Sequence, residues 1–200
     1  MNTKGERDDE LVLELLDAIG KQSNLSQRHL ARQLGVALGL ANSYLKRCIR
    51  KGYVKIRTAP ANRYLYYLTP KGFAEKSRLT AKYLSYSFTF YRHASASCAE
   101  VFQQCALRGW KRVVLCGISD LAEIASLQAT EAEIEIVAIY DPRADRKRFV
   151  GKKVWTDLDG IETFDACVLT DLQSPSTSHQ QLVERVGQER VMVPDILRLE

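Results

Sequence analysis

Eleven lysine and arginine side chains lie between Asp17 and Glu75 without one acidic side chain among them. A solvated protein surface normally mixes both signs of charge, whereas a surface of one sign attracts the opposite sign. The stretch is also rich in Leu and Tyr, as a folded domain is. We therefore expect a folded surface that binds a polyanion, with nucleic acid as the first candidate and membrane phosphate as the second.

A second group of residues with a chemical meaning begins at Gly117. Gly117, Ser119 and Ala122 have the spacing of the dinucleotide-binding fingerprint G-x-G-x-x-G/A, with a serine in place of the second glycine. Asp141 follows 24 residues after Gly117, close to the place of the acid that binds a ribose. Ser119 narrows the approach to a pyrophosphate, and Asp120 adds a negative charge there. The pattern favours the fold more strongly than the ligand.

Three short helices are expected in the basic half of the chain. The first covers 9–19, where apolar residues share one helical face, and Gly20 is expected to end it. The second begins after Ser26, a typical N-cap, and ends at Gly35. The third covers about 38–51. Its inner face is expected to hold Ala41, Tyr44, Leu45 and Cys48.

The second and third helices, joined by a tight turn, predict a helix-turn-helix, whose second helix normally lies in the DNA major groove. Two β-rich runs, 53–58 and 64–69, then predict a hairpin, or wing. Arg57, Asn62 and Arg63 are expected at its tip, where they could enter the adjacent minor groove. Small or polar residues of the third helix would contact bases, and its later basic residues would contact phosphate. A generic three-helix bundle with a solvated basic face is the alternative. The candidate DNA-binding residues are Ser26, Gln27, Arg28, Gly39, Asn42, Ser43, Lys46, Arg47, Arg50, Arg57, Asn62 and Arg63.

The segments LSQRHLARQLGVALGLANSYLKRCIRKGYV and YLYYLTPKGFAEKSRLT resemble the winged-helix regulators of the MarR type. The resemblance covers about residues 9–92, and it is greatest to the subgroup associated with exopolysaccharide gene clusters. It implies a homodimeric DNA-binding repressor or activator. Ala37 is a departure, because related sequences place a Ser or Thr cap before the recognition helix, and the loss of such a cap costs about 1 kcal/mol.

Residues 70–108 are expected to form one more helix, with Thr69 as N-cap and Pro70 at the first helical position. Aromatic side chains are dense in its part KYLSYSFTFYRHA. The helix either packs against its own domain or forms a dimer interface, which would place two recognition helices on a palindrome. Cys98 and Cys105 lie seven residues apart on it, and a redox switch through them is a weaker hypothesis.

Short apolar runs alternate with helical patterns in the second half of the chain. WKRVVLC, EIEIVAIY, FDACVLT and RVMV predict strands, and DLAEIASLQAT and HQQLVERVGQE predict helices. This alternation predicts a parallel sheet that is covered by helices on both sides.

The segments VVLCGISDLAEIA, IEIVAIYDP, FVGKKVW and FDACVLTD also resemble a known family. They are similar to the small Rossmann-like domain at the front of sugar acetyltransferases and related nucleotide-sugar enzymes, and to the CoA-binding domain. This resemblance implies a nucleotide sugar, NAD or CoA as ligand. The alternative is a domain without ligand that serves dimerisation or partner binding. The expected ligand-binding residues are Gly117, Ser119, Asp120, Leu121, Asp141, Thr170 and Asp171.

Catalytic chemistry has little support in the sequence. The three histidines, His29, His93 and His179, belong to no Ser-His-Asp or metal-binding pattern, and the five cysteines include no CxxC pair. We therefore predict no catalytic residue and no metal ligand. The rival hypothesis is a nucleotide-sugar-dependent enzyme with a DNA-tethering domain. The polar N-terminus and the lack of a long apolar run predict a cytoplasmic protein that does not enter a membrane.

The net charge of +5 hides a division of the chain. Residues 1–108 carry 18 basic and 8 acidic side chains, whereas residues 109–200 carry 11 and 16. We expect an α/β protein with a winged helix-turn-helix domain at 1–80, a connecting or dimerisation helix at 81–108 and a Rossmann-like parallel sheet at 109–200. The expected function is a dimeric transcription regulator that senses a nucleotide or nucleotide sugar and is linked to polysaccharide biosynthesis. Its acidic half should lie away from DNA.

Overall fold

The computed structural model describes residues 4–60 and 63–199 and divides the chain into two compact units, Met1–Ser87 and Phe88–Glu200. The boundary lies within one helix, α4 (Pro70–Leu107). The expected connecting segment 81–108 is therefore the greater part of α4, whose start belongs to the first unit and whose end belongs to the second. Each unit has its own hydrophobic core.

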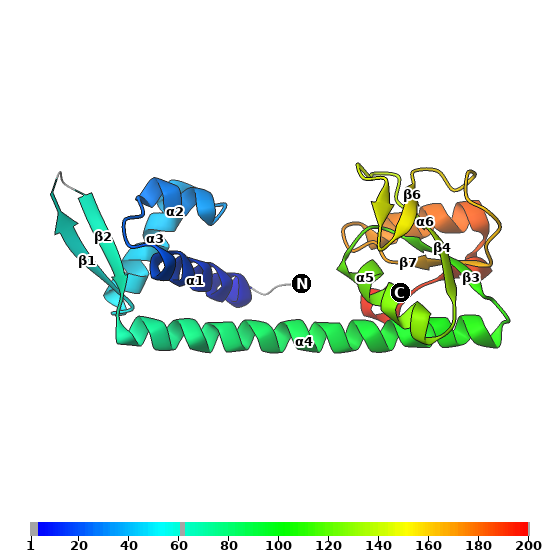
Figure 1. Ribbon diagram of the computed structural model, residues 1–200, viewed down its shortest axis with the longest axis horizontal. Coiled ribbons are helices and arrows are strands. Elements are labelled where there is room, and N and C mark those ends of the chain that lie inside the picture. The colour runs from blue at the N-terminus through cyan, green and yellow to red at the C-terminus, as the bar shows by residue number, and fades with distance from the viewer. Residues whose placement is uncertain (1–3, 61–62, 200) are drawn as a thin grey trace. The chain divides into compact units, whose positions relative to one another are not determined.

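The first unit consists of three helices, a hairpin and the start of α4 (Figure 1). The prediction that Gly20 ends the first helix was wrong, since the amide of Gln22 still donates to the carbonyl of Ala18 at 3.1 Å. The helix also begins earlier than expected, because the acidic residues of its first turns stabilise the helix dipole. The elements are α1 (Lys4–Lys21), α2 (Gln27–Gln33), α3 (Leu38–Arg50), β1 (Val54–Ala59) and β2 (Arg63–Leu68).

The start of α2 is capped and the start of α3 is not. Ser26 Oγ accepts a hydrogen bond from the amide of His29 at 3.1 Å, which confirms the predicted N-cap. Ala37 makes no side-chain hydrogen bond at the start of α3. This helix is held instead by its inner face, where Ala41, Leu45 and Cys48 are buried.

The hairpin is fastened to the start of α4 by Thr69. Its hydroxyl donates to the carbonyl of Gly52 at 2.6 Å and accepts from the amide of Gly72 at 3.0 Å, so Thr69 is the N-cap that the sequence predicted. A Cβ atom on Gly72 would lie 2.1 Å from the carbonyl oxygen of Tyr53. Only glycine fits this approach between the wing and α4.

The second unit contains a six-stranded sheet in the order β5-β6-β4-β3-β7-β8. All neighbouring strands are parallel except β5 and β6, which form an antiparallel hairpin that the sequence did not predict. The five parallel strands follow the chain in the order 3-2-1-4-5, the order of a Rossmann fold. The bounds are β3 (Arg112–Cys116), α5 (Asp120–Glu131), β4 (Glu135–Tyr140), β5 (Arg148–Phe149), β6 (Lys152–Trp155), β7 (Ala166–Leu169), α6 (Pro175–Val186) and β8 (Val191–Met192), with short 3-10 turns at Gln188–Arg190 and Asp195–Leu197.

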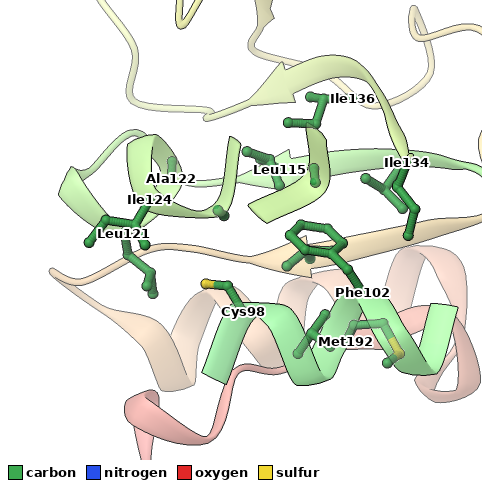
Figure 2. Close-up of a cluster of buried hydrophobic side chains, with 14 of the residues drawn as sticks. Cys98, Phe102, Leu115, Leu121, Ala122, Ile124, Ile134, Ile136 and Met192 are labelled. Atoms are coloured by element: carbon green, nitrogen blue, oxygen red, sulfur yellow. The ribbon is translucent and has the colours of Figure 1, made fainter. Parts of the chain in front are cut away.

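Both faces of this sheet are buried, as the continuous apolar runs predicted. Alternate residues of β3 point to opposite faces, so Val113 and Leu115 belong to one cluster while Val114 and Cys116 belong to another. The first cluster is completed by α5 and by the end of α4, from which Cys98 and Phe102 project toward the sheet (Figure 2). The second cluster is completed by α6. The Rossmann-like fold class is thus confirmed.

The close approach at Gly72 predicts a specific loss of stability. Gly72→Ala forces the new methyl group into the backbone of Tyr53, and we expect it to lower the free energy of unfolding by about 1–3 kcal/mol. Gly39→Ala is the control, because nothing lies within 4 Å of a Cβ there and alanine favours a helix by up to ~1 kcal/mol. Urea unfolding followed by circular dichroism compares them, and equal midpoints would contradict the packing described.

Candidate nucleotide crevice and nucleic-acid interface

The Rossmann crevice lies where β3 and β7 end, at the point where the strand order reverses. Here Gly117 has a φ of +111°, and a Cβ atom on it would lie 2.5 Å from Cα of Asp171. Because residue 117 has no Cβ atom, the backbone that follows β7 can pass close to it. In a dinucleotide-binding turn the corresponding space admits a pyrophosphate.

The polar groups of the crevice bind one another. Ser119 Oγ donates to the carbonyl of Thr170 at 2.6 Å and accepts from the amide of Ala122 at 3.3 Å, as the N-cap of α5. Thr170 Oγ1 donates to the carbonyl of Gly117 at 2.6 Å. Asp141 Oδ2 accepts from the amide of Ile118 at 3.0 Å. Ser119, Asp141 and Thr170 thus lie close together, and each forms hydrogen bonds with groups of the protein itself.

An arginine that the sequence analysis did not single out joins the two buried carboxylates. Arg143 Nη2 lies 2.6 Å from Asp171 Oδ2, and its Nε lies 3.7 Å from Asp141 Oδ1. The same oxygen of Asp171 accepts from Ser178 Oγ at 2.6 Å. Burial raises the pKa of Asp171, but the hydrogen bonds from Ser178, Gln173 and Arg143 outweigh burial and lower it overall.

The space left in the crevice is small. A cavity of about 10 Å³ lies among Gly117, Asp141, Arg143 and Asp171, which is room for about one water molecule. Asp120, also expected to bind ligand, is exposed at the start of α5, whereas Leu121 is fully buried in the core and offers no side chain to a ligand. In this conformation the enclosed space of the crevice is too small for a nucleotide.

The cysteines of α4 are poorly suited to redox chemistry. Cys98 and Cys105 are fully buried, and burial raises the pKa of Cys98 to about 12 and that of Cys105 to about 11. Because the thiolate is the reactive form, both thiols should be inert in the folded protein.

Within residues 4–60 and 63–199, no group of three His, Cys, Asp or Glu side chains could hold a metal ion. No helix in the described ranges is long and apolar enough to span a membrane.

The outer face of α3 carries a stripe of exposed residues, Gly39, Ser43, Lys46 and Arg50. Their spacing of four, three and four residues places them on one side of the helix. No acidic residue lies in its first turn. We call these four residues the outer stripe. It combines small or polar groups near the helix start with cations toward its end.

Two other candidates of α3 lie beside this stripe. Arg47 Nη1 forms a salt bridge with Asp8 Oδ2 of α1 at 2.7 Å, and its guanidinium lies 4.6 Å from the centre of the Tyr44 ring. The Tyr44 hydroxyl donates to Asp8 as well, which explains why Tyr44 is only partly buried. Arg47 therefore holds α3 against α1. Asn42 Oδ1 is buried and has no hydrogen-bond partner among the described residues.

The remaining candidates lie on α2 and on the wing. Ser26, Gln27 and Arg28 are exposed, although Gln27 Nε2 also donates to the Tyr66 hydroxyl at 3.3 Å. Arg57 was expected at the tip of the wing, but it lies opposite Leu65, two residue pairs before the turn, with its guanidinium 5.9 Å from the Tyr67 ring. Arg63 is the first residue of β2, next to the turn. Asn62 lies outside the described residues.

The family comparison decides what this arrangement is. Residues 8–55 match the family model described as winged helix-turn-helix DNA-binding. The first unit is a winged helix-turn-helix domain. A comparison with curated proteins finds no match to the chain.

Solved structures have a distant likeness to the chain. A MarR family protein of Mycobacterium tuberculosis in complex with p-aminosalicylic acid is 24% identical over 36% of this chain and 55% of its own, with a TM-score of 0.33. FabT of Streptococcus pneumoniae in complex with DNA is 25% identical over 39% and 55%, with a TM-score of 0.33. The O-methyltransferase NcsB1 from neocarzinostatin biosynthesis, in complex with S-adenosylmethionine, is 12% identical over 96% and 64%, with a TM-score of 0.26. This chain spans little more than half the length of the first two, and at these TM-scores no function is taken from the likeness.

The winged helix-turn-helix domain also exposes residues that the sequence analysis did not consider. Leu38 and Leu40 in the first turn of α3 are 42% and 45% exposed. An apolar side chain at this place can contact a thymine methyl group in the major groove. The sequence gives no clear signal for this exposure, because apolar periodicity alone does not show which leucines lack a buried partner.

Proposed function

We propose that the chain is a DNA-binding transcription regulator of the MarR type, with α3 as the recognition helix. The outer stripe is the observation that carries this proposal, since it leaves the start of α3 free for base edges and places Lys46 and Arg50 where they can bind phosphate. The match of residues 8–55 to the winged helix-turn-helix model supports it. Neither Lys46 nor Arg50 forms a salt bridge within the described ranges.

Charge reversal of the outer stripe should abolish DNA binding. We expect Lys46→Glu/Arg50→Glu to lower affinity at least ~100-fold, because two phosphate contacts become repulsive. Fluorescence anisotropy with duplexes selected from a random library measures it. Lys111→Glu, an exposed change in the second unit, is the control and should leave affinity within about twofold. Equal affinities of both variants, with unchanged circular dichroism, would refute the assignment of α3. Arg47 is unsuitable for this test, because its replacement also breaks the bond to Asp8.

We further propose that α4 forms a homodimer with a second copy of the chain. Between residues 83 and 91, six apolar or aromatic side chains are at least 41% exposed: Tyr83, Leu84, Tyr86, Phe88, Phe90 and Tyr91. Exposed aromatic residues at such density are characteristic of an interaction surface. A two-fold dimer is the partner that the winged helix favours, because it presents two recognition helices to a palindromic site.

Charges in this segment should separate the dimer. We expect Phe88→Glu/Tyr91→Glu to be monomeric at micromolar concentration, because the carboxylates would be buried in the interface. Gln103→Glu/Gln104→Glu, two exposed positions later in α4, adds the same charge and should remain dimeric. Sedimentation velocity measures both, and a wild-type monomer would overturn the proposal at once.

The second unit is proposed to respond to an effector, a nucleotide sugar, NAD or CoA. The Rossmann strand order and the place of Gly117 and Asp171 at the switch point support this role. Arg143 occupies the crevice through its salt bridge to Asp171, so an effector would have to displace this side chain, and the displacement would lower the apparent affinity. The link to polysaccharide biosynthesis stays a prediction from the sequence resemblance.

Opening the crevice should therefore strengthen effector binding. We expect Arg143→Ala/Asp171→Asn to lower the apparent dissociation constant of the effector, since it removes the competing salt bridge without leaving an unpaired carboxylate at residue 171 to repel an anionic ligand. Thermal shift and calorimetry with UDP-glucose, NAD and CoA test it, with Arg146→Ala as the control outside the crevice. If neither the wild type nor this double variant binds any of the three, the second unit is a dimerisation or partner-binding module.

A further inference from the structure

One short segment of the second unit has an excess of positive charge. Residues 143–155, here called the basic hairpin, comprise β5, β6 and the loop before them and contain six of the unit's basic residues with a single acid, Asp145. The other residues of the unit carry seven basic and sixteen acidic side chains. A segment of opposite sign on an acidic domain is not explained by solubility, which the acidic surface already provides.

Two cations of the basic hairpin face each other across its strands, which is unfavourable for a hairpin without a bound anion. Arg148 stands directly opposite Lys153 across the two strands, and like charges in such a pair destabilise a hairpin. A bound polyanion would neutralise this repulsion. The side chains of Arg146, Lys147, Arg148 and Lys153 are all exposed. Within the described residues, the one salt bridge that they form joins Arg146 to Asp145 at 4.0 Å.

Local contacts hold these cations in place. Lys153 Nζ lies 3.4 Å from the centre of the Trp155 ring, and Arg146 Cζ lies 5.7 Å from that of Phe149. Arg148 Nη2 donates to the carbonyl of Gly151 at 2.7 Å, across the turn of the hairpin. The aromatic contacts limit the conformational freedom of two long side chains, so that less entropy is lost when they bind an anion.

We propose that the basic hairpin binds the phosphate backbone of duplex DNA, in addition to the winged helix. The choice of duplex DNA as the polyanion rests on the proposed function. Lysine and arginine side chains on both strands of a short hairpin can bind the phosphate oxygens of any duplex, so the contribution of these contacts should be independent of DNA sequence. The acidic second half of the chain is then not uniformly repelled by DNA.

The test measures how the affinity of the full chain for a random-sequence 40-base-pair duplex depends on salt. Arg146→Gln/Lys147→Gln/Lys153→Gln removes three cations and leaves the Arg148 bond to Gly151 intact. We expect the slope of log affinity against log salt to fall by about 2–3 and the affinity at ~0.1 M salt to fall at least ~10-fold. Arg92→Gln/Lys111→Gln/Arg198→Asn removes three exposed cations elsewhere in the unit and should leave the slope unchanged.

Three outcomes would overturn the proposal. An unchanged slope in the hairpin variant removes DNA as the partner. Aggregation of that variant with unchanged DNA affinity would show that the cations only protect β5, which is an edge strand. Loss of binding to phosphatidylserine vesicles with an unchanged DNA slope would assign the hairpin to a membrane. Lys46→Glu/Arg50→Glu, measured on the same duplex, tests the winged helix separately, so the failure of one proposal is distinguishable from that of the other.

Discussion

The burial of one face of α3 is the constraint on which the proposed DNA interface depends. Ala41, Leu45 and Cys48 are held in the core of the first unit, and the helix period then directs the outer stripe toward solvent. The salt bridge between Arg47 and Asp8 adds a polar restraint at the edge of the same packed face. A recognition helix needs this kind of support, because base contacts depend on a rigid placement of the backbone.

The second unit shows how a Rossmann fold can be kept while its crevice is closed. A dinucleotide fold leaves the amides and hydroxyls at its first turn for a phosphate, whereas here Ser119 and Thr170 bind neighbouring carbonyl groups. Arg143 neutralises the carboxylate of Asp171, which would otherwise be an unpaired buried charge. Any effector must therefore replace hydrogen bonds and a salt bridge that these groups already form within the protein. The free energy of breaking these contacts lowers the observed affinity for the effector.

The distribution of charge links the two units to one proposed partner. The winged helix has the acid-free stretch, and the second unit has the basic hairpin within an otherwise acidic surface. Electrostatic contacts to phosphate supply affinity that does not depend on sequence, while the start of α3 supplies sequence choice. The two roles are therefore assigned to different residues, and each can be removed without the other.

The sequence by itself determined the local structure. The period of apolar residues predicted α2, α3 and the parallel sheet, and Ser26 and Thr69 were recognised as caps because a cap is a contact over three residues. Only the tertiary structure decided the rest. It paired Arg47 with Asp8, moved Arg57 away from the wing tip, and placed Arg143 in the crevice. The pairs Arg47–Asp8 and Arg143–Asp171 join groups far apart in the chain, whose meeting is set by packing and not by any pattern that a short stretch of residues carries. The place of Arg57 is set by the register of the two strands of the wing, which the sequence pattern does not specify.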